Sequence, residues 1–207
     1  MICAIIFLPV GVLWPAVGVL SMLAVMEYAI LWGKKIDQSH LSFLSVLLIL
    51  LGPVVIGLGL LSLPEIAMRH GNLMMLYTVA IVKFSDVGGF AFGLTSAKLM
   101  KNRGGNHKMC PTISPGKSWE GFVGSLLLSS AVSLAFMGVT HFSVPKSIAL
   151  GVVAAVVGTA GDLVESKFKR WVGVKDSSTM KITNGLGGFL DMFDSLIFAP
   201  AVLSCFY

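Results

Sequence analysis

The sequence predicts an all-α protein, a polytopic integral membrane bundle of about six to seven transmembrane helices with basic cytoplasmic loops. Hydrophobic residues make up 56% of the 207 residues and charged residues only 12%, and the mean hydropathy is +0.88. A soluble domain usually carries about a quarter charged residues, so this chain has too little polar surface to cover a water-soluble globule. The odd number of cysteines, three, excludes a disulfide scaffold.

Apolar stretches long enough to cross a bilayer, about 20 residues each, define the predicted spans. Five lie at roughly 41–63, 73–95, 119–139, 147–165 and 186–206, and a further span is expected at about 15–32. Because Pro9 and Pro15 interrupt the first apolar run, we expect a short apolar segment before that span, forming a tight hairpin with it. No repeat or linker is visible, so we predict a single domain over residues 1–207.

The distribution of basic residues predicts the orientation in the membrane. Lys and Arg number two, one, five, one and five in the five successive connections. Cytoplasmic loops carry the excess of Lys and Arg, so the connections near 34, 96–118 and 166–185 are expected in the cytoplasm. A site between them would open to the cytoplasm, from the cytoplasmic membrane if the source is bacterial. The net charge of +5 then reflects these loops and anionic ligands rather than nucleic acid.

Six of the ten acidic residues lie within or at the ends of apolar spans: Glu27, Asp86, Asp162, Glu165, Asp191 and Asp194. Each charge near the bilayer centre costs about 2.5–3.5 kcal/mol. These side chains must therefore face a polar interior, pair with bases, bind cations or become protonated. Asp86 follows Lys83 by three residues, so a local ion pair is an alternative there. For Glu27 we expect snorkelling or pairing inside the bundle rather than catalysis.

Helical spacing groups four of these acids into two pairs. Asp191 and Asp194 are three residues apart and share one helix face, and residues 162 and 165 repeat the arrangement. Like charges so placed repel each other unless a cation lies between them. Oxygen ligands with no His or Cys nearby suit Mg²⁺ or a similar hard cation. The alternative is a set of structural ion pairs with the bases that follow, namely Lys169, Arg170 and Lys175.

Glycine clusters accompany the acids, at residues 88, 89 and 93, at 121 and 124, and at 185, 187 and 188. Small residues let transmembrane helices approach closely, and the last cluster has the alternative of exposing backbone N–H groups to a phosphate. The basic connections lie beside intramembrane carboxylates. Lys and Arg bind a polyanion and the carboxylates bind a divalent cation, so together they suit a metal–polyphosphate complex. The basic segment 98–117 suits anionic lipid headgroups equally well. The intramembrane placement indicates a second substrate that arrives from the lipid.

Three sequence blocks resemble the phosphatidate cytidylyltransferases, the CDP-diacylglycerol synthases. Residues 85–93 read SDVGGFAFG, residues 114–121 read SPGKSWEG, and residues 161–195 contain GDLVES, KR, KDSS and GGFLDMFDS in family order. The resemblance covers about 80–200, and we expect the chain to be shortened on its N-terminal side relative to the family. It implies transfer of CMP from CTP to phosphatidate, giving CDP-diacylglycerol and pyrophosphate for phospholipid biosynthesis.

The resemblance also implies roles for individual residues. Asp162, Asp191 and Asp194 would hold Mg²⁺, with room for a second cation such as K⁺, and would form the catalytic centre with Lys117. Phosphate groups would be bound by Ser114, Lys169, Arg170, Lys175, Gly187 and Gly188. Supporting positions are Asp86, Glu120 and Glu165, with Glu120 orienting Lys117 or aiding the cation. The implied partners are CTP, phosphatidate, the lipid bilayer and, for a homodimer, a second copy of the chain.

Departures from the family pattern leave other readings open. Leu186 and Met192 stand where the family has histidine and arginine, Gly116 replaces a lysine, and the turn between Asp176 and Gly187 is two residues longer. The alternatives are a related CTP-dependent enzyme acting on another lipid, an ion transporter that uses the intramembrane acids, and a catalytically silent scaffold.

Overall fold

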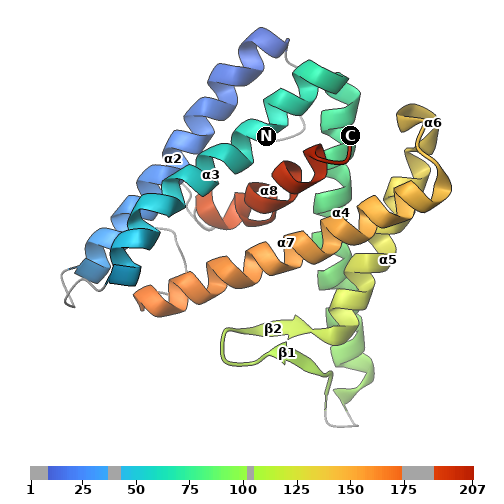
Figure 1. The fold of residues 1–207 in the computed structure, drawn as a ribbon. Coiled ribbons are helices and arrows are strands. Elements are labelled where there is room, and N and C mark those ends of the chain that lie inside the picture. Colours follow the sequence, from blue (N-terminus) through green and yellow to red (C-terminus); the bar gives the residue numbers. More distant parts are fainter. Residues whose placement is uncertain (1–8, 37–42, 102–104, 174–188) are drawn as a thin grey trace.

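The computed structural model describes residues 9–36, 43–101, 105–173 and 189–207. These residues form seven helices and a two-stranded hairpin (Figure 1). In chain order the elements are α2 (Val10–Ile36), α3 (Phe43–His70), α4 (Asn72–Leu99), β1 (Lys108–Cys110), β2 (Ser114–Ser118), α5 (Trp119–Ala135), α6 (Met137–Thr140), α7 (Val144–Val172) and α8 (Phe189–Ser204). The all-α class is confirmed, and each predicted span overlaps a helix, although the span predicted at 119–139 is divided between α5 and α6 and α7 extends beyond the predicted end at residue 165. The single-domain organisation stays a prediction.

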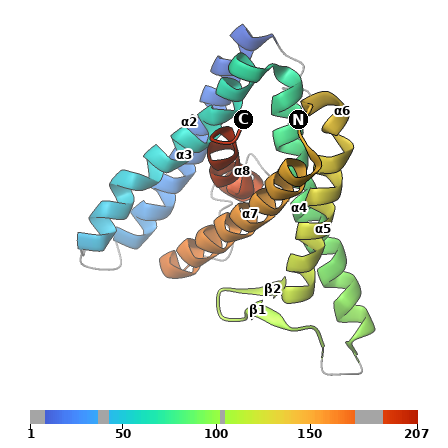
Figure 2. The same ribbon diagram turned by 45° about the vertical axis from the view of Figure 1, so that its right-hand side comes forward.

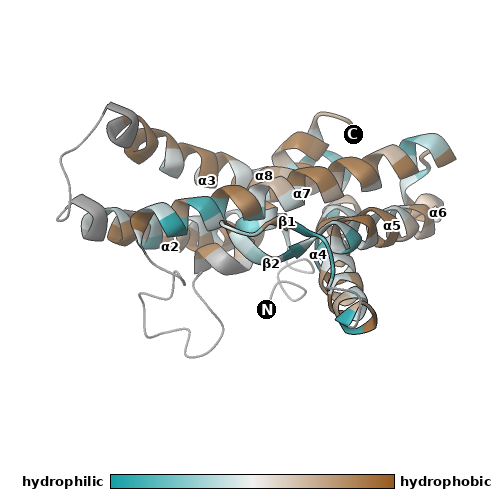
Figure 3. Ribbon diagram, turned by 90° about the horizontal axis from the view of Figure 1, so that it is seen from below, coloured by the Kyte–Doolittle hydropathy of each residue, from teal (hydrophilic) through white to brown (hydrophobic). Residues whose placement is uncertain are grey.

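Long apolar helices account for the membrane character of the chain. Four helices, α2, α3, α4 and α7, are long and apolar enough to cross a membrane, whereas α5 and α8 are shorter apolar helices. Large hydrophobic side chains point outward, among them Leu50 and Leu58 at 66% exposure and Phe90 at 73%. Such outward apolar surface suits lipid rather than water. Seen from below, hydrophilic residues gather at the hairpin, while the long helices are largely hydrophobic (Figure 3).

The first described helix begins earlier than predicted. We expected Pro15 to mark its start, but α2 begins at Val10, and Pro15 lies inside it. The carbonyl oxygen of Pro9 accepts the N–H groups of Val12 and Leu13, at 2.8 and 3.1 Å. Membrane helices tolerate an internal proline because neighbouring groups satisfy the freed carbonyl. The prediction of a separate short apolar segment before residue 15 is wrong for residues 10–14, which continue α2 without a hairpin. The rest of that segment, residues 1–8, lies outside the described residues.

The helices pack as two groups joined by α7 and α8 (Figures 1 and 2). In one group α2 lies along α3, and in the other α4 lies along α5. Helix α8 packs against α3 on one side and against α7 and α4 on the other. The C-terminal ends of α2, α4 and α7 lie on the same side of the molecule as the hairpin, towards the bottom of Figure 1. The turn between α3 and α4 lies on the opposite side. This agrees with the predicted alternation of the connections.

The connection between α4 and α5 contains the hairpin, which we had expected only as a basic loop. β1 and β2 pair antiparallel, with Lys108 opposite Ser118 and Cys110 opposite Ser114. Strands of three and five residues are too short to show a hydrophobic period. Ser118 ends β2 and caps α5, because its Oγ accepts the N–H of Gly121 at 3.2 Å. The hairpin is therefore fastened directly to the first turn of α5.

Small residues bring α4 and α5 into close contact. A Cβ added at Gly88 would lie 2.5 Å from the carbonyl oxygen of Gly124, and one at Gly121 would lie 2.7 Å from that of Gly89. Alongside them, Ser125, Ser129 and Ser133 repeat every four residues on α5 and are buried. Ser125 donates to the carbonyl oxygen of Ser85 on α4 at 2.9 Å, and Ser133 to that of Ser147 on α7 at 2.6 Å. The hydroxyl of Ser129 shares its one proton between the carbonyl oxygens of Ile81 on α4 and Gly151 on α7, at 3.0 and 2.9 Å. The close-packing interpretation of these two glycine clusters is confirmed.

Replacing Gly88 with alanine should destabilise the bundle, because its Cβ would meet backbone atoms that cannot rotate away. Overpacking of this kind costs about 1–3 kcal/mol. The free energy of unfolding of the detergent-solubilised protein measures the effect. Gly57→Ala is the matched control, since a Cβ there meets nothing within 4 Å. Equal stability of the two variants would contradict the close packing of α4 and α5.

Candidate active site

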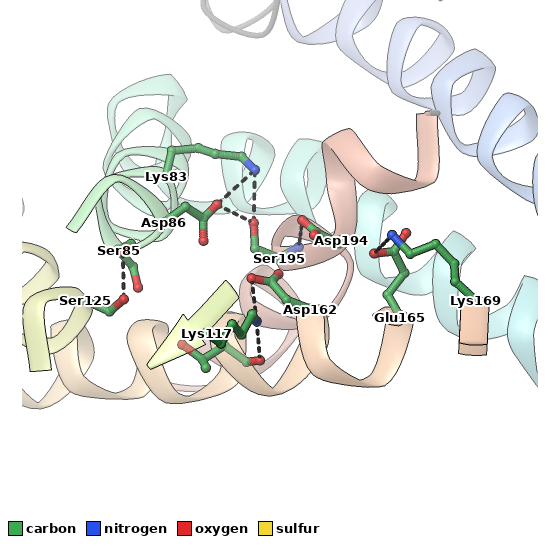
Figure 4. A network of polar contacts seen from close by, with 11 residues as sticks. Lys83, Ser85, Asp86, Lys117, Ser125, Asp162, Glu165, Lys169, Asp194 and Ser195 are labelled. Atoms are coloured by element: carbon green, nitrogen blue, oxygen red, sulfur yellow. Dashed lines mark hydrogen bonds and ion pairs between the residues drawn. The ribbon is translucent and has the colours of Figure 1, made fainter. Parts of the chain in front are cut away.

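A closed group of three side chains joins α4 to α8. Lys83 Nζ lies 3.2 Å from Asp86 Oδ2 and donates to Ser195 Oγ at 3.0 Å. Ser195 Oγ donates in turn to Asp86 Oδ2 at 2.9 Å, and Ser195 is fully buried. Figure 4 shows the three groups meeting between the two helices. The local ion pair between Lys83 and Asp86, which the spacing offered as an alternative, is confirmed, and Ser195 extends it to α8.

A second ion pair joins the hairpin to α7. Lys117 Nζ lies 3.0 Å from Asp162 Oδ2 and donates to the carbonyl oxygen of Thr159 at 3.1 Å. Both charged side chains are largely buried, at 24% and 22% exposure. The other carboxylate oxygen, Asp162 Oδ1, is buried and has no hydrogen-bond partner among the described residues. A buried, unpartnered carboxylate oxygen costs free energy and fits a site for a cation.

The third carboxylate of this region belongs to Asp194. It lies close enough to Asp86 and Asp162 for their negative charges to repel its own, and its Oδ1 accepts the N–H of Ser195. Three carboxylates thus face two lysines, Lys83 and Lys117 (Figure 4). An all-oxygen donor set with excess negative charge suits Mg²⁺. Within the described side chains, however, no three such ligands gather closely enough to enclose an ion.

A cavity of about 290 Å³ lies beside these groups, bounded by the hairpin, α4, α5 and α7. Asp86, Lys117 and Asp162 lie in its wall, together with hydroxyl, glycine and apolar residues: Ser114, Ser118, Ser125, Thr159, Gly89, Gly116, Gly121, Phe90, Phe122 and Met109. The cavity therefore combines one ammonium group, two carboxylates and several hydroxyls with apolar side chains. Ser114, for which the resemblance implies phosphate binding, and Lys117, which it places in the catalytic centre, both line the cavity.

Other predicted residues have partners away from this group. Lys169 Nζ lies 3.1 Å from Glu165 Oε2, with both side chains buried, and Figure 4 shows this pair set apart from Asp162. The structural alternative thus holds for Glu165 and Lys169. Arg170 Nε donates to the carbonyl oxygen of Ile113 at 3.4 Å, which ties the end of α7 to the hairpin turn.

Glu120 also differs from the expectation that it orients Lys117. Its Oε1 lies 2.7 Å from His107 Nδ1 and accepts the backbone N–H of the same residue at 3.1 Å. Both hydrogen bonds favour the ionised form of Glu120, at the hairpin end of α5. The carboxylate stays ionised at neutral pH and fastens the start of the hairpin to α5.

Several predicted site residues lie outside the described residues: Lys175, Gly187 and Gly188, together with the departure at Leu186. Asp191 and Met192 belong to the first turn of α8, but their side chains are not described. The proposed roles of these residues stay predictions.

The structure adds Ser195 and Thr159 to the residues that the sequence singled out. Both could have been found from helical spacing, since Thr159 precedes Asp162 by three residues and Ser195 follows Asp191 by four. Met109, Phe90 and Phe122 carried no such signal, because apolar residues are common throughout this chain.

The model of the Cytidylyltransferase family matches residues 1–207. The chain belongs to this family. It is 37% identical to the phosphatidate cytidylyltransferase of Staphylococcus aureus (strain COL) over 193 residues, 92% of this chain and 70% of that protein. The enzymes of the same name from Staphylococcus saprophyticus and Staphylococcus epidermidis are 35% and 34% identical, over 89% and 92% of this chain and 68% and 70% of theirs.

Family membership agrees with the placement of the sequence blocks. In this cytidylyltransferase the first block lies on α4, the second forms β2 and the start of α5, and the described parts of the third lie on α7 and α8. Residues 31 and 45 positions apart in the chain thus meet around one cavity, which Asp86, Lys117 and Asp162 line. The resemblance found in the sequence is confirmed.

A double-mutant cycle on Lys83→Met and Asp86→Asn should give a coupling energy of about 0.5–3 kcal/mol in the free energy of unfolding. The pair is two-thirds buried, so either single change leaves a partner without its counter-charge. The control cycle uses Arg69→Met and Glu65→Gln, an exposed helical pair, for which we expect less than about 1 kcal/mol. A coupling no larger than that of the exposed pair would show that Lys83 and Asp86 do not stabilise each other.

Proposed function

We propose that this chain transfers CMP from CTP to phosphatidate, giving CDP-diacylglycerol and pyrophosphate in phospholipid biosynthesis. The names of its relatives, with which it shares 34–37% of aligned residues, support the reaction. The observation that carries the assignment to a site is the pairing of Lys117 with Asp162 at the wall of a cavity inside a membrane bundle. There a cation for phosphate and a carboxylate for metal lie side by side.

The chemistry follows from this charge arrangement. A phosphate oxygen of phosphatidate attacks the α-phosphorus of CTP in line, the new P–O bond forms, and the bond to pyrophosphate breaks. Such a displacement depends on positioning and charge neutralisation. Lys117 and Ser114 bind phosphate at the hairpin side of the cavity. Arg170 and Lys175 contribute further positive charge to the triphosphate, whereas Lys169 pairs with Glu165.

Asp162, Asp191 and Asp194 would hold Mg²⁺, with a second cation such as K⁺ as a further expectation. The buried, unpartnered oxygen of Asp162 supports this assignment. Bound Mg²⁺ supplies positive charge that offsets the developing charge on the departing pyrophosphate. Asp86 and Ser195 hold α4 and α8 together beside these ligands.

The site opens to the cytoplasm in this proposal. The ends of α2, α4 and α7, where the basic connections begin, lie on one side of the molecule together with the hairpin (Figure 1). The excess of Lys and Arg in these connections supports a cytoplasmic location for that side. CTP then arrives from water and phosphatidate from the bilayer. A homodimer stays a prediction.

The first test is turnover by the purified protein in detergent with phosphatidate and labelled CTP, with and without Mg²⁺. Metal-dependent formation of both CDP-diacylglycerol and pyrophosphate is the expected result. Turnover with another lipid but not with phosphatidate would show that the acceptor lipid is a different one. CTP binding without product would indicate a catalytically silent homologue. Absence of CTP binding would favour the alternative hypothesis of an ion transporter that uses the intramembrane acids.

Asp162→Asn and Asp191→Asn should each abolish Mg²⁺-dependent turnover while leaving the protein in the membrane fraction. Each change keeps the size of the side chain and removes the negative charge that a divalent cation requires. Glu65→Gln, on an exposed face of α3, serves as the control and should retain wild-type activity. Near-normal activity of either aspartate variant would remove that residue from the metal site.

Lys117→Met should raise the KM for CTP and lower kcat, by about 10²–10³-fold in kcat/KM, the usual effect of losing one electrostatic contact to a reacting group. Lys98→Met is the matched control, because Lys98 is an exposed lysine near the end of α4 on the same side. An equal loss of kcat/KM in the two variants would show that Lys117 contributes only to the overall positive charge of this side and makes no specific contact with CTP.

A further inference from the structure

Glu27 is a buried acid that the proposed reaction does not use. It lies well inside α2, only 1% exposed, and its Oε2 accepts the backbone N–H of Leu190 at 2.8 Å. Leu190 lies in the first turn of α8 and is itself buried. The contact joins α2 to α8 through two residues that are 163 positions apart in the chain. The pairing role expected for Glu27 inside the bundle is therefore confirmed, and its partner is a helix end.

The first N–H groups of a helix have no partner within the helix. In the interior of a membrane bundle water does not supply one, so a side chain must. A carboxylate is the strongest available acceptor, because its negative charge is also attracted to the partial positive charge at the helix N-terminus. Glu27 thus holds the start of α8 in place from a different helix.

A second anchor holds α8 a little over one turn later. Ser195 is five residues beyond Leu190 and contacts both Lys83 and Asp86 on α4. The residues between the two anchors include Asp191 and Asp194. The helical segment that carries these two acids is therefore fastened at its start to α2 and at its end to α4.

We propose that Glu27 is a positioning residue for the metal site. By holding Leu190, it sets the place and register of the helical segment that carries Asp191 and Asp194. Glu27 is not among the residues that line the cavity, and its effect passes through the backbone of α8. This inference rests on the proposed function, because the role of the three aspartates belongs to it.

The experiment compares Glu27→Leu, Glu27→Gln and Tyr28→Phe in the cytidylyltransferase assay, with Mg²⁺ titrated for each variant. Tyr28→Phe is the matched control, since Tyr28 is the next residue on α2 and its hydroxyl donates to Leu48 of α3 at 2.8 Å rather than to α8. We expect Glu27→Leu to raise the Mg²⁺ concentration for half-maximal activity, or lower kcat, by about 10–100-fold, as loss of a supporting contact around metal ligands does. Glu27→Gln keeps an oxygen acceptor, so its Mg²⁺ requirement and kcat should change less than those of Glu27→Leu. Tyr28→Phe should keep the wild-type Mg²⁺ dependence.

Hydrogen–deuterium exchange over residues 189–204 gives a readout that does not depend on activity. Amides of the first turn of α8 should exchange faster in Glu27→Leu than in the wild type and in Tyr28→Phe. Unchanged exchange and unchanged Mg²⁺ dependence in both Glu27 variants would overturn the inference, as would equal changes in Tyr28→Phe. If Glu27→Leu does not fold, Glu27→Gln against Tyr28→Phe decides between the same outcomes. An inactive wild type with the expected exchange pattern would overturn the proposed reaction and would leave the anchoring of α8 by Glu27 supported.

Discussion

The architecture around the site depends on one constraint, that a charge inside a membrane bundle needs a counter-charge or a strong hydrogen bond. The buried acids meet it in different ways. Asp86 and Glu165 pair with lysines on their own helices, whereas Asp162 pairs with Lys117 of the hairpin and Glu27 with a backbone N–H of α8. The last two contacts cross between elements, so satisfying the charge also fixes where the hairpin and α8 lie.

Close packing of α4 and α5 serves the same region. Glycines 88 and 124 let the two backbones approach, while the neighbouring Gly89 and Gly121 line the cavity. The serine hydroxyls further along α5 satisfy helix carbonyls and join α5 to α4 and α7 without bulky side chains. Because Ser118 caps α5 and Lys117 directly precedes it, the packing of these helices determines where the Lys117 ammonium group lies. Features that stabilise the bundle therefore also position the charges of the site.

The sequence predicted the helices well because hydrophobicity continuous over about 20 residues has few other structural meanings. It predicted Asp86, Lys117 and Asp162 as one group only through the resemblance to a family, since the residues are 31 and 45 positions apart. Helical spacing predicted that Asp162 and Glu165 act as a pair. In the structure, Asp162 instead forms an ion pair with Lys117 of the hairpin, and Glu165 forms one with Lys169. The neighbours of each helix face decide such cases, and a single sequence does not reveal them. For the same reason the partner of Glu27 was recognisable only as something inside the bundle.

The pairing of Lys117 with Asp162 has a consequence for how the proposed substrates would bind. Lys117 neutralises the carboxylate that we assign to Mg²⁺, and the same ammonium group is assigned to a phosphate of CTP. A cation that binds Asp162 weakens the hold of this carboxylate on Lys117 and leaves the lysine more available to phosphate. Coupling of this kind is reciprocal, so CTP that engages Lys117 strengthens cation binding by the same factor. A single ion pair between the hairpin and α7 thus favours joint binding of metal and nucleotide over binding of either one alone.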